Sequence, residues 1–188
     1  MLDPLTNLPI IRILNGFQTT WLDYPDNKSL AIIVCMLGCD NCCKGCQNPD
    51  LKNFNYENNS IVDYTIDSFC NELMVECKRQ RTNKVVFSGG DPLSSFNIDN
   101  VKQILERIGS LVDICVYTGH TVDYCRKNKV SGFKFLKCGG FDLTKYRQSY
   151  KNDDEMCFAS PNQELYNDNY KLLSVKQLQG QRGCISAA

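Results

Sequence analysis

Short apolar runs rich in β-branched residues alternate along the chain with segments in which apolar residues recur every three or four positions. The short runs are typical of buried strands, and the second pattern is typical of helices with one buried face. The spacing of Ile66, Phe69, Cys70, Leu73 and Cys77 illustrates the helical pattern. The pattern predicts strands at 30–36, 84–87, 111–117 and 133–136, and helices at 66–77, 98–108 and 121–128.

This alternation predicts βαβ units around a parallel sheet, which places the chain in the α/β class. Helical crossovers bring the carboxyl ends of the strands to one edge of the sheet. The loops that hold Cys39 to Cys46, Gly89 to Asp91 and Gly119 each follow a predicted strand, so we expect them to meet at that edge. Open α/β sheets and α/β barrels carry their functional sites there.

The pattern weakens after residue 142. We expect residues 143–169 to be irregular, 170–175 to form a last strand, and 176–188 to be a tail. With 188 residues the chain suits a single domain, 1–188, around one core.

Charge and hydropathy exclude several functional classes. Lysine and arginine together equal aspartate and glutamate at 21 each, and no basic stripe is visible, so nucleic acid is not an expected partner. The apolar runs are too short to cross a bilayer, and residues 1–15 lack the pattern of a secretion signal. We therefore expect a cytoplasmic protein with no membrane partner.

Twelve cysteines are unusual for such a chain. A disulfide scaffold is one interpretation, but the length, the missing signal sequence and the predicted helices favour reduced thiols. Many of these thiols would be plain core residues.

The densest cysteine segment, 35–49, contains two registers of the spacing C-x3-C-x2-C. One consists of Cys35, Cys39 and Cys42, and the other of Cys39, Cys43 and Cys46. Cys35 falls within a predicted buried strand, whereas the second set lies beyond Gly38 in a loop. We therefore expect Cys39, Cys43 and Cys46 to act together.

Three thiolates on one short loop can hold three irons of a [4Fe-4S] cube, a cluster that usually has four cysteine ligands. One iron would then stay open for a substrate. A four-cysteine zinc site built from two C-x2-C pairs is the alternative, although directly adjacent pairs would strain its tetrahedral closure.

A second motif, Ser88-Gly89-Gly90-Asp91-Pro92-Leu93, follows a predicted strand. The glycine pair permits close approach of the backbone to a ligand, and the Asp91 carboxylate can accept hydrogen bonds from an ammonium group. The same residues could form an ordinary turn.

Together these motifs resemble radical S-adenosylmethionine enzymes, and more narrowly the activating component of anaerobic ribonucleotide reductase. The resemblance rests on the cysteine loop through Gln47-Asn48-Pro49, on the Ser88 to Leu93 motif, and on later segments that occur in the family's order, which are 21–25, 117–120, 136–142 and 159–163. It departs from the family at His120, where an aromatic residue is usual, and at Cys138, where an aspartate is frequent.

The resemblance implies an incomplete (β/α) barrel of radical S-adenosylmethionine type with a mostly parallel sheet. It implies a [4Fe-4S] cluster on Cys39, Cys43 and Cys46, and S-adenosylmethionine held by the remaining matched residues, Gly45, Gln47, Gly89, Gly90 and Asp91. No side chain is expected to act as a catalytic acid or base.

The implied reaction is reductive cleavage of S-adenosylmethionine, followed by removal of a hydrogen atom from a glycine of the reductase. An external one-electron donor such as a flavodoxin would reduce the cluster. Two rivals stay open, which are a radical enzyme of deazapurine synthase type acting on a small molecule, and a zinc-binding interaction module without catalytic activity.

Overall fold

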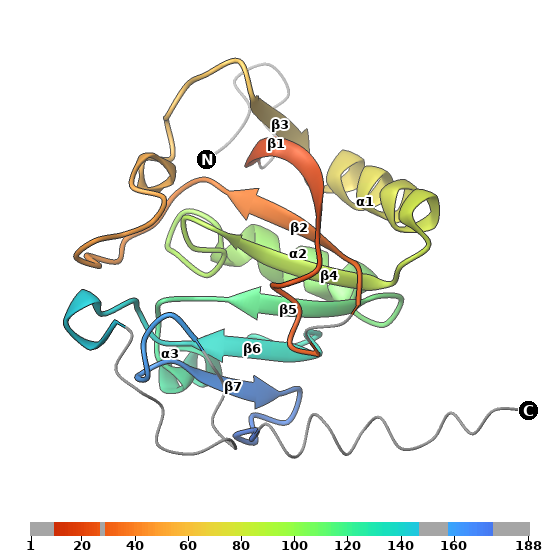
Figure 1. Cartoon of the computed structure of the whole chain (residues 1–188). Helices are drawn as coiled ribbons and strands as arrows, with labels where there is room; N and C mark the ends of the chain where they lie inside the picture. The colour runs from red at the N-terminus through yellow and green to blue at the C-terminus, as the bar shows by residue number, and fades with distance from the viewer. Residues whose placement is uncertain (1–9, 27–28, 147–157, 175–188) are drawn as a thin grey trace, which may run out of the picture.

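The chain forms one seven-stranded sheet with three helices on one side of it (Figure 1). The structure is a computed structural model, and it describes residues 10–26, 29–146 and 158–174. The strand order is β3-β1-β2-β4-β5-β6-β7. Strands β2 (Ala31–Met36), β4 (Lys84–Gly89), β5 (Asp113–Tyr117) and β6 (Phe135–Cys138) are parallel to one another and form the centre of the sheet.

Antiparallel strands flank this parallel centre. On one side, β1 (Ile10–Thr20) pairs with β2, and β3 (Ile61–Thr65) pairs with β1. On the other side, β7 (Glu164–Asn167) pairs with β6. The sheet does not close, since β3 and β7 are its two edges. The predicted α/β class with a parallel centre is therefore confirmed, and the open sheet agrees with an incomplete barrel.

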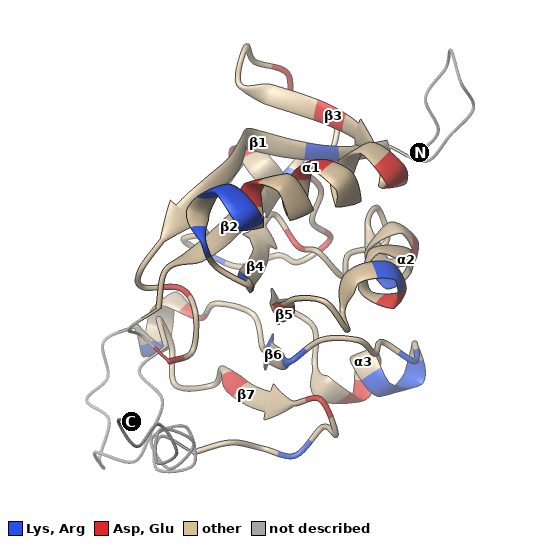
Figure 2. Cartoon of the chain, turned by 90° about the vertical axis from the view of Figure 1, so that its right-hand side faces the viewer, with Lys and Arg blue, Asp and Glu red and all other residues tan. Residues whose placement is uncertain are grey.

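The three helices are α1 (Ile66–Gln80), α2 (Ile98–Ile108) and α3 (Val122–Lys127). Figure 2 shows all three on the same side of the sheet. The larger apolar cluster lies between them and the sheet, and includes Phe69, Leu73, Phe87 and Ile104. The helical spacing in the sequence therefore marks the residues that pack on the strands.

Local signals explain where two of these helices begin. Thr65 and Thr121 cap the amino ends of α1 and α3, each accepting a hydrogen bond from the backbone N–H three residues later. Helix α1 ends at Arg81, which takes the left-handed conformation with a φ of 54°. The two short 3-10 helices, Asp50–Lys52 and Leu143–Lys145, lie in the loops beside the candidate site.

Three strands differ from the sequence-based expectation. Strands β1 and β3 were not predicted, and β1 is interrupted in its pairing with β2 near Asn15 and Gly16, which both have positive φ. This interruption breaks the alternation on which strand prediction depends. The last strand is β7, not 170–175, because the side chains of Leu165 and Tyr166 are the ones buried against β6. The predicted tail at 176–188 lies outside the described residues.

Candidate functional site

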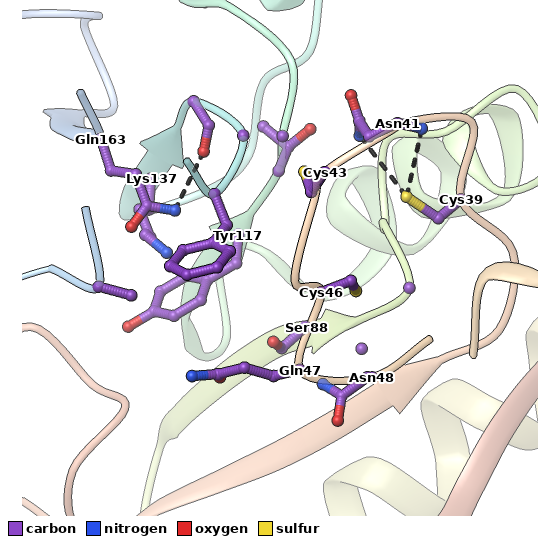
Figure 3. Close-up of a pocket in the computed structure, with 18 of the residues that line it drawn as sticks. Cys39, Asn41, Cys43, Cys46, Gln47, Asn48, Ser88, Tyr117, Lys137 and Gln163 are labelled. Carbon is purple, nitrogen blue, oxygen red and sulfur yellow. Dashed lines mark hydrogen bonds between the residues drawn. The ribbon is translucent and has the colours of Figure 1, made fainter. Parts of the chain in front are cut away.

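A cavity of about 160 Å³ opens at the carboxyl ends of the parallel strands (Figure 3). Its wall is formed by the loops that follow β2, β4, β5 and β6, together with residues just before β7. The expectation that these loops meet at one edge is therefore confirmed. Parallel strands joined by helices place their following loops together, and the cavity is the result of that topology.

Three cysteines of the loop after β2 line the cavity, and these are Cys39, Cys43 and Cys46. Cys35 does not line it, because it lies within β2 and pairs with Leu14 on one side and Ser88 on the other. Cys42 is exposed and belongs to a neighbouring hollow instead. Of the two registers, only the second therefore has all three of its cysteines on the cavity wall. Which thiols hold a cluster stays a prediction.

The sulfur of Cys39 is held in place by Asn41, whose backbone N and side-chain Nδ2 donate to it at 3.4 and 3.6 Å (Figure 3). Burial raises the pKa of the Cys39 thiol, and the hydrogen bonds from Asn41 lower it. Donors directed at a sulfur favour its thiolate form, which is the form that ligates iron. No sequence signal had marked Asn41.

The thiols fit an iron–sulfur cube by their chemistry. The cavity wall carries three thiols but no histidine, aspartate or glutamate among the described residues, and thiolates are the usual ligands of such clusters. In the described part of the chain, no three side chains of the His, Cys, Asp or Glu type are placed to hold one metal ion. A cube does not require such convergence, because each thiolate binds a different iron.

Gly89, the last residue of β4, and Gly90, which follows it, bring their backbone against β2 and the cysteine loop. A Cβ atom on Gly89, whose φ is +107°, would lie 2.5 Å from the backbone N of Met36. A Cβ atom on Gly90 would lie 2.5 Å from the carbonyl oxygen of Leu51. Both glycines line the cavity, so any side chain here would separate the loops that form its wall.

Asp91 joins three loops beneath the cavity. Its carboxylate accepts hydrogen bonds from the N–H groups of Leu93 and Gly119 at 2.8 and 2.9 Å, from the Thr118 hydroxyl at 3.1 Å, and from Asn41 Nδ2 at 2.6 Å. Only 1% of the residue is exposed, and it is not part of the cavity wall. Burial raises the pKa of this carboxyl, while the N–H donors oppose that rise. The structure therefore places Asp91 as a support for the loops that form the wall.

Asn97 is a second buried connector that sequence reasoning missed. Its Nδ2 donates to the carbonyl oxygens of Leu37 at 2.7 Å and Asp91 at 3.0 Å, and thereby ties the loop after β2 to the loop after β4. Asn97 precedes α2 and caps its amino end without a side-chain hydrogen bond. A capping asparagine is a common feature of sequences, so its position gave no sign of this role.

Gly45 and Gln47, which flank Cys46 and belong to the family resemblance, lie in different places relative to the cavity. Gln47 lines the cavity, and its contact with a cofactor stays a prediction. Gly45 does not line it. Gly45 has a φ of +72°, and a Cβ atom there would meet the Leu143 side chain at 3.0 Å. The structure places Gly45 against the loop after β6, and not at the cavity wall.

The segment 159–163 positions the loop after β6. Gln163 Nε2 donates to the Gly139 carbonyl at 3.1 Å, and Asn162 Nδ2 donates to the Gly140 carbonyl at 2.8 Å. Ser160 is fully buried, and its hydroxyl accepts from the backbone N of Asp142 at 3.2 Å. Gln163 also lines the cavity. This polar segment therefore holds part of the wall, in addition to contributing to it.

The two departures from the family pattern have structural explanations. His120 stacks on Tyr124, with ring centroids 3.8 Å apart, and its Nε2 lies 3.2 Å from Asp40 Oδ1 in the cysteine loop. Cys138 is buried on the helix side of β6, where its thiol hydrogen-bonds with that of Cys125, and this contact is the main cause of its raised pKa. Cys157 and Cys184 lie outside the described residues.

Within the residues that the structure describes, no helix combines the length and apolar character needed to cross a bilayer. Among solved structures, the chain is similar to QueE from Escherichia coli, with 17% sequence identity and a TM-score of 0.40. That similarity covers 59% of this chain and about half of the QueE chain, 54%. No curated protein matches the sequence.

The family comparison agrees with the chemistry of the cavity. Residues 29–166 match the model of a family described as a 4Fe-4S single cluster domain. The matched region includes the cysteine loop and every other loop that lines the cavity. Since it spans well over half of the chain, this protein belongs to the family of 4Fe-4S single cluster domains.

Proposed function

We propose that the chain is a radical S-adenosylmethionine enzyme that generates a glycyl radical on an anaerobic ribonucleotide reductase. The observation that carries the proposal is the placement of Cys39, Cys43 and Cys46 on one cavity, directly beside the Gly89–Gly90 turn. Membership in a single-cluster 4Fe-4S family supports the cluster. The reductase as the partner rests on the sequence resemblance.

In this proposal the three cysteines would hold the cluster, which would leave one iron without a protein ligand. Backbone groups of Gly89 and Gly90 orient the methionyl end of the cofactor, because these glycines bring main chain to the wall without side chains. Asp91 acts indirectly by holding the loops around them. When bound, the cluster and cofactor would supply the one-electron cleavage that yields the 5′-deoxyadenosyl radical.

The first test is anaerobic reconstitution with iron and sulfide, followed by addition of S-adenosylmethionine and a low-potential reductant. We expect a brown protein that releases 5′-deoxyadenosine, and a Cys43→Ala variant that binds no cluster and releases none. A colourless protein carrying one equivalent of zinc would refute the proposal in favour of the zinc-binding module.

The second test concerns the partner. Incubation of the loaded protein with an anaerobic ribonucleotide reductase should produce the doublet of a glycyl radical in the electron paramagnetic resonance spectrum of the reductase. A flavodoxin should replace the chemical reductant. Release of 5′-deoxyadenosine without any radical on the reductase would contradict the assigned partner and favour a small-molecule substrate.

A further inference from the structure

Lys137 is a cation directed into the cavity from the strand β6. Alternation along β6 places Leu136 and Cys138 in the cluster beneath the helices, whereas Phe135 belongs to the apolar cluster on the opposite side of the sheet. Lys137 shares that opposite side and lines the cavity together with the three cysteines (Figure 3). No sequence signal had singled it out.

Two aromatic rings hold the ammonium group. Lys137 Nζ lies 4.6 Å from the centroid of the Tyr117 ring and 5.4 Å from that of the Phe158 ring. Tyr117 is itself fixed, because its hydroxyl donates to the backbone carbonyl of Asp23. Contacts with both rings favour this position of the lysine and reduce its contact with water.

The charge of Lys137 has no carboxylate partner within 4 Å among the described residues. The carboxylate that acts on it from farther away is Asp23. Burial lowers the pKa of Lys137 to about 8, which reflects the cost of keeping this charge away from water. Such a cost is usually offset by an anion.

The other charged residues of the cavity wall also favour an anion as the occupant. Two lysines, Lys52 and Lys137, line the cavity, and none of its described lining residues is an aspartate or glutamate. The chain as a whole has equal numbers of basic and acidic residues. Apart from the three thiols, the charged side chains of the wall are thus all positive, which favours an occupant that carries negative charge.

A cube held by three thiolates carries one net negative charge when oxidised and gains a second on one-electron reduction. We propose that the positive charge of Lys137 offsets this negative charge and thereby raises the reduction potential of the cluster. The inference depends on the proposed function in one respect only, which is that a cluster binds at Cys39, Cys43 and Cys46. The electron comes from an added reductant, and no bond forms or breaks in the step.

The test is a potentiometric titration of the reconstituted protein, followed by electron paramagnetic resonance of the reduced cluster. Lys137→Met removes the charge with little change in length, and Lys137→Arg retains it. The matched control is Lys134→Met, since Lys134 lies three residues earlier and is exposed.

We expect the ratio of reduced to oxidised cluster at a fixed potential to fall about tenfold in Lys137→Met, as for a unit charge at roughly 10 Å in a medium of intermediate polarity. A tenfold change corresponds to a potential about 59 mV more negative for one electron. Lys137→Arg and the Lys134→Met control should stay close to the unmodified protein.

Equal potentials in Lys137→Met and the unmodified protein would overturn the inference, as would equal shifts in the Met and Arg variants. Loss of cluster loading in Lys137→Met alone would support it, because the charge would then be needed to hold the anionic cluster. Loss in both variants would overturn it. If the unmodified protein itself takes up no cluster, both the proposed function and this inference fail, whereas unchanged potentials on loaded proteins refute only the inference.

Discussion

Replacing Asp91 by alanine should destabilise the fold without cluster or cofactor present. The substitution removes the acceptor for four hydrogen bonds, donated by Asn41, Leu93, Thr118 and Gly119. Thr118 and Leu93 are themselves buried, at 5% and 0% exposure, so water cannot easily replace the carboxylate there. A buried donor left unpaired costs ~1–3 kcal/mol. The Leu93 N–H and the Thr118 hydroxyl together would therefore lower the stability of the fold by about 2–6 kcal/mol.

We therefore expect Asp91→Ala to lower the free energy of unfolding by about 4 kcal/mol, a large share of the ~5–15 kcal/mol typical of a domain. Asp91→Asn should cost about 2 kcal/mol, since the amide oxygen can replace the oxygen that accepts three of the bonds. The amide NH₂ would then face the N–H of Leu93, which leaves that donor unpaired.

The measurement is urea unfolding of the cluster-free protein under reducing conditions, followed by circular dichroism, with equal denaturant slopes as a condition for comparison. Asp168→Ala is the control, because Asp168 is exposed in the loop after β7, and it should change stability by no more than about 0.5 kcal/mol. A loss below about 1 kcal/mol for Asp91→Ala would refute the supporting role. If that variant stayed stable but no longer bound S-adenosylmethionine, direct contact with the cofactor would be the better explanation.

Other predictions address the cysteines and the glycine turn. Cys43→Ala should abolish cluster binding, whereas Cys35→Ala should leave iron content and the brown colour largely intact; the reverse pattern would overturn the chosen register. Exposure of the loaded protein to air should bleach it within the time of an absorbance measurement, because an open iron is accessible to oxygen, and a colour stable for days would contradict a three-ligand cluster. Gly90→Ala should lower the free energy of unfolding by about 2 kcal/mol in urea titrations, since its Cβ would lie 2.5 Å from a backbone carbonyl oxygen. Burial raises the pKa of Cys77 to about 11, so its thiolate fraction at pH 8 is about one thousandth and grows about tenfold per pH unit up to that value. Iodoacetamide followed by mass spectrometry should thus modify exposed Cys42 at least about a hundredfold faster, and equal rates would refute this.

The regular elements of the parallel centre could be predicted because their signals are local. The helix predicted at 98–108 agrees with α2, and the run at 30–36 agrees with β2 within one residue. Strands β1 and β3 could not be predicted, since they depend on pairing between distant segments, such as Ile11 with Tyr64. Strand β7 is four residues long and gains its burial from contacts with distant segments, among them its pairing with β6.

For the site, the residue pattern was enough to identify the reactive groups and the order of the loops that carry them. The spacing of Cys39, Cys43 and Cys46 and the glycine pair at the end of β4 are features of short segments, so they could be recognised from the sequence alone. Spacing also left two cysteine registers open, and the folded arrangement was needed to show which set lines the cavity.

The roles of several other residues depend on neighbours far away in the chain, and these roles emerged only from the packing of the loops. The carboxylate of Asp91 serves loops that lie up to 50 residues away, and the cation of Lys137 faces thiols nearly a hundred positions earlier. Hydrogen bonds and Coulomb forces act through space and leave no periodic mark on the sequence. Strand and helix propensities act between near neighbours, which is why the sequence revealed the framework and the fold revealed its electrostatics.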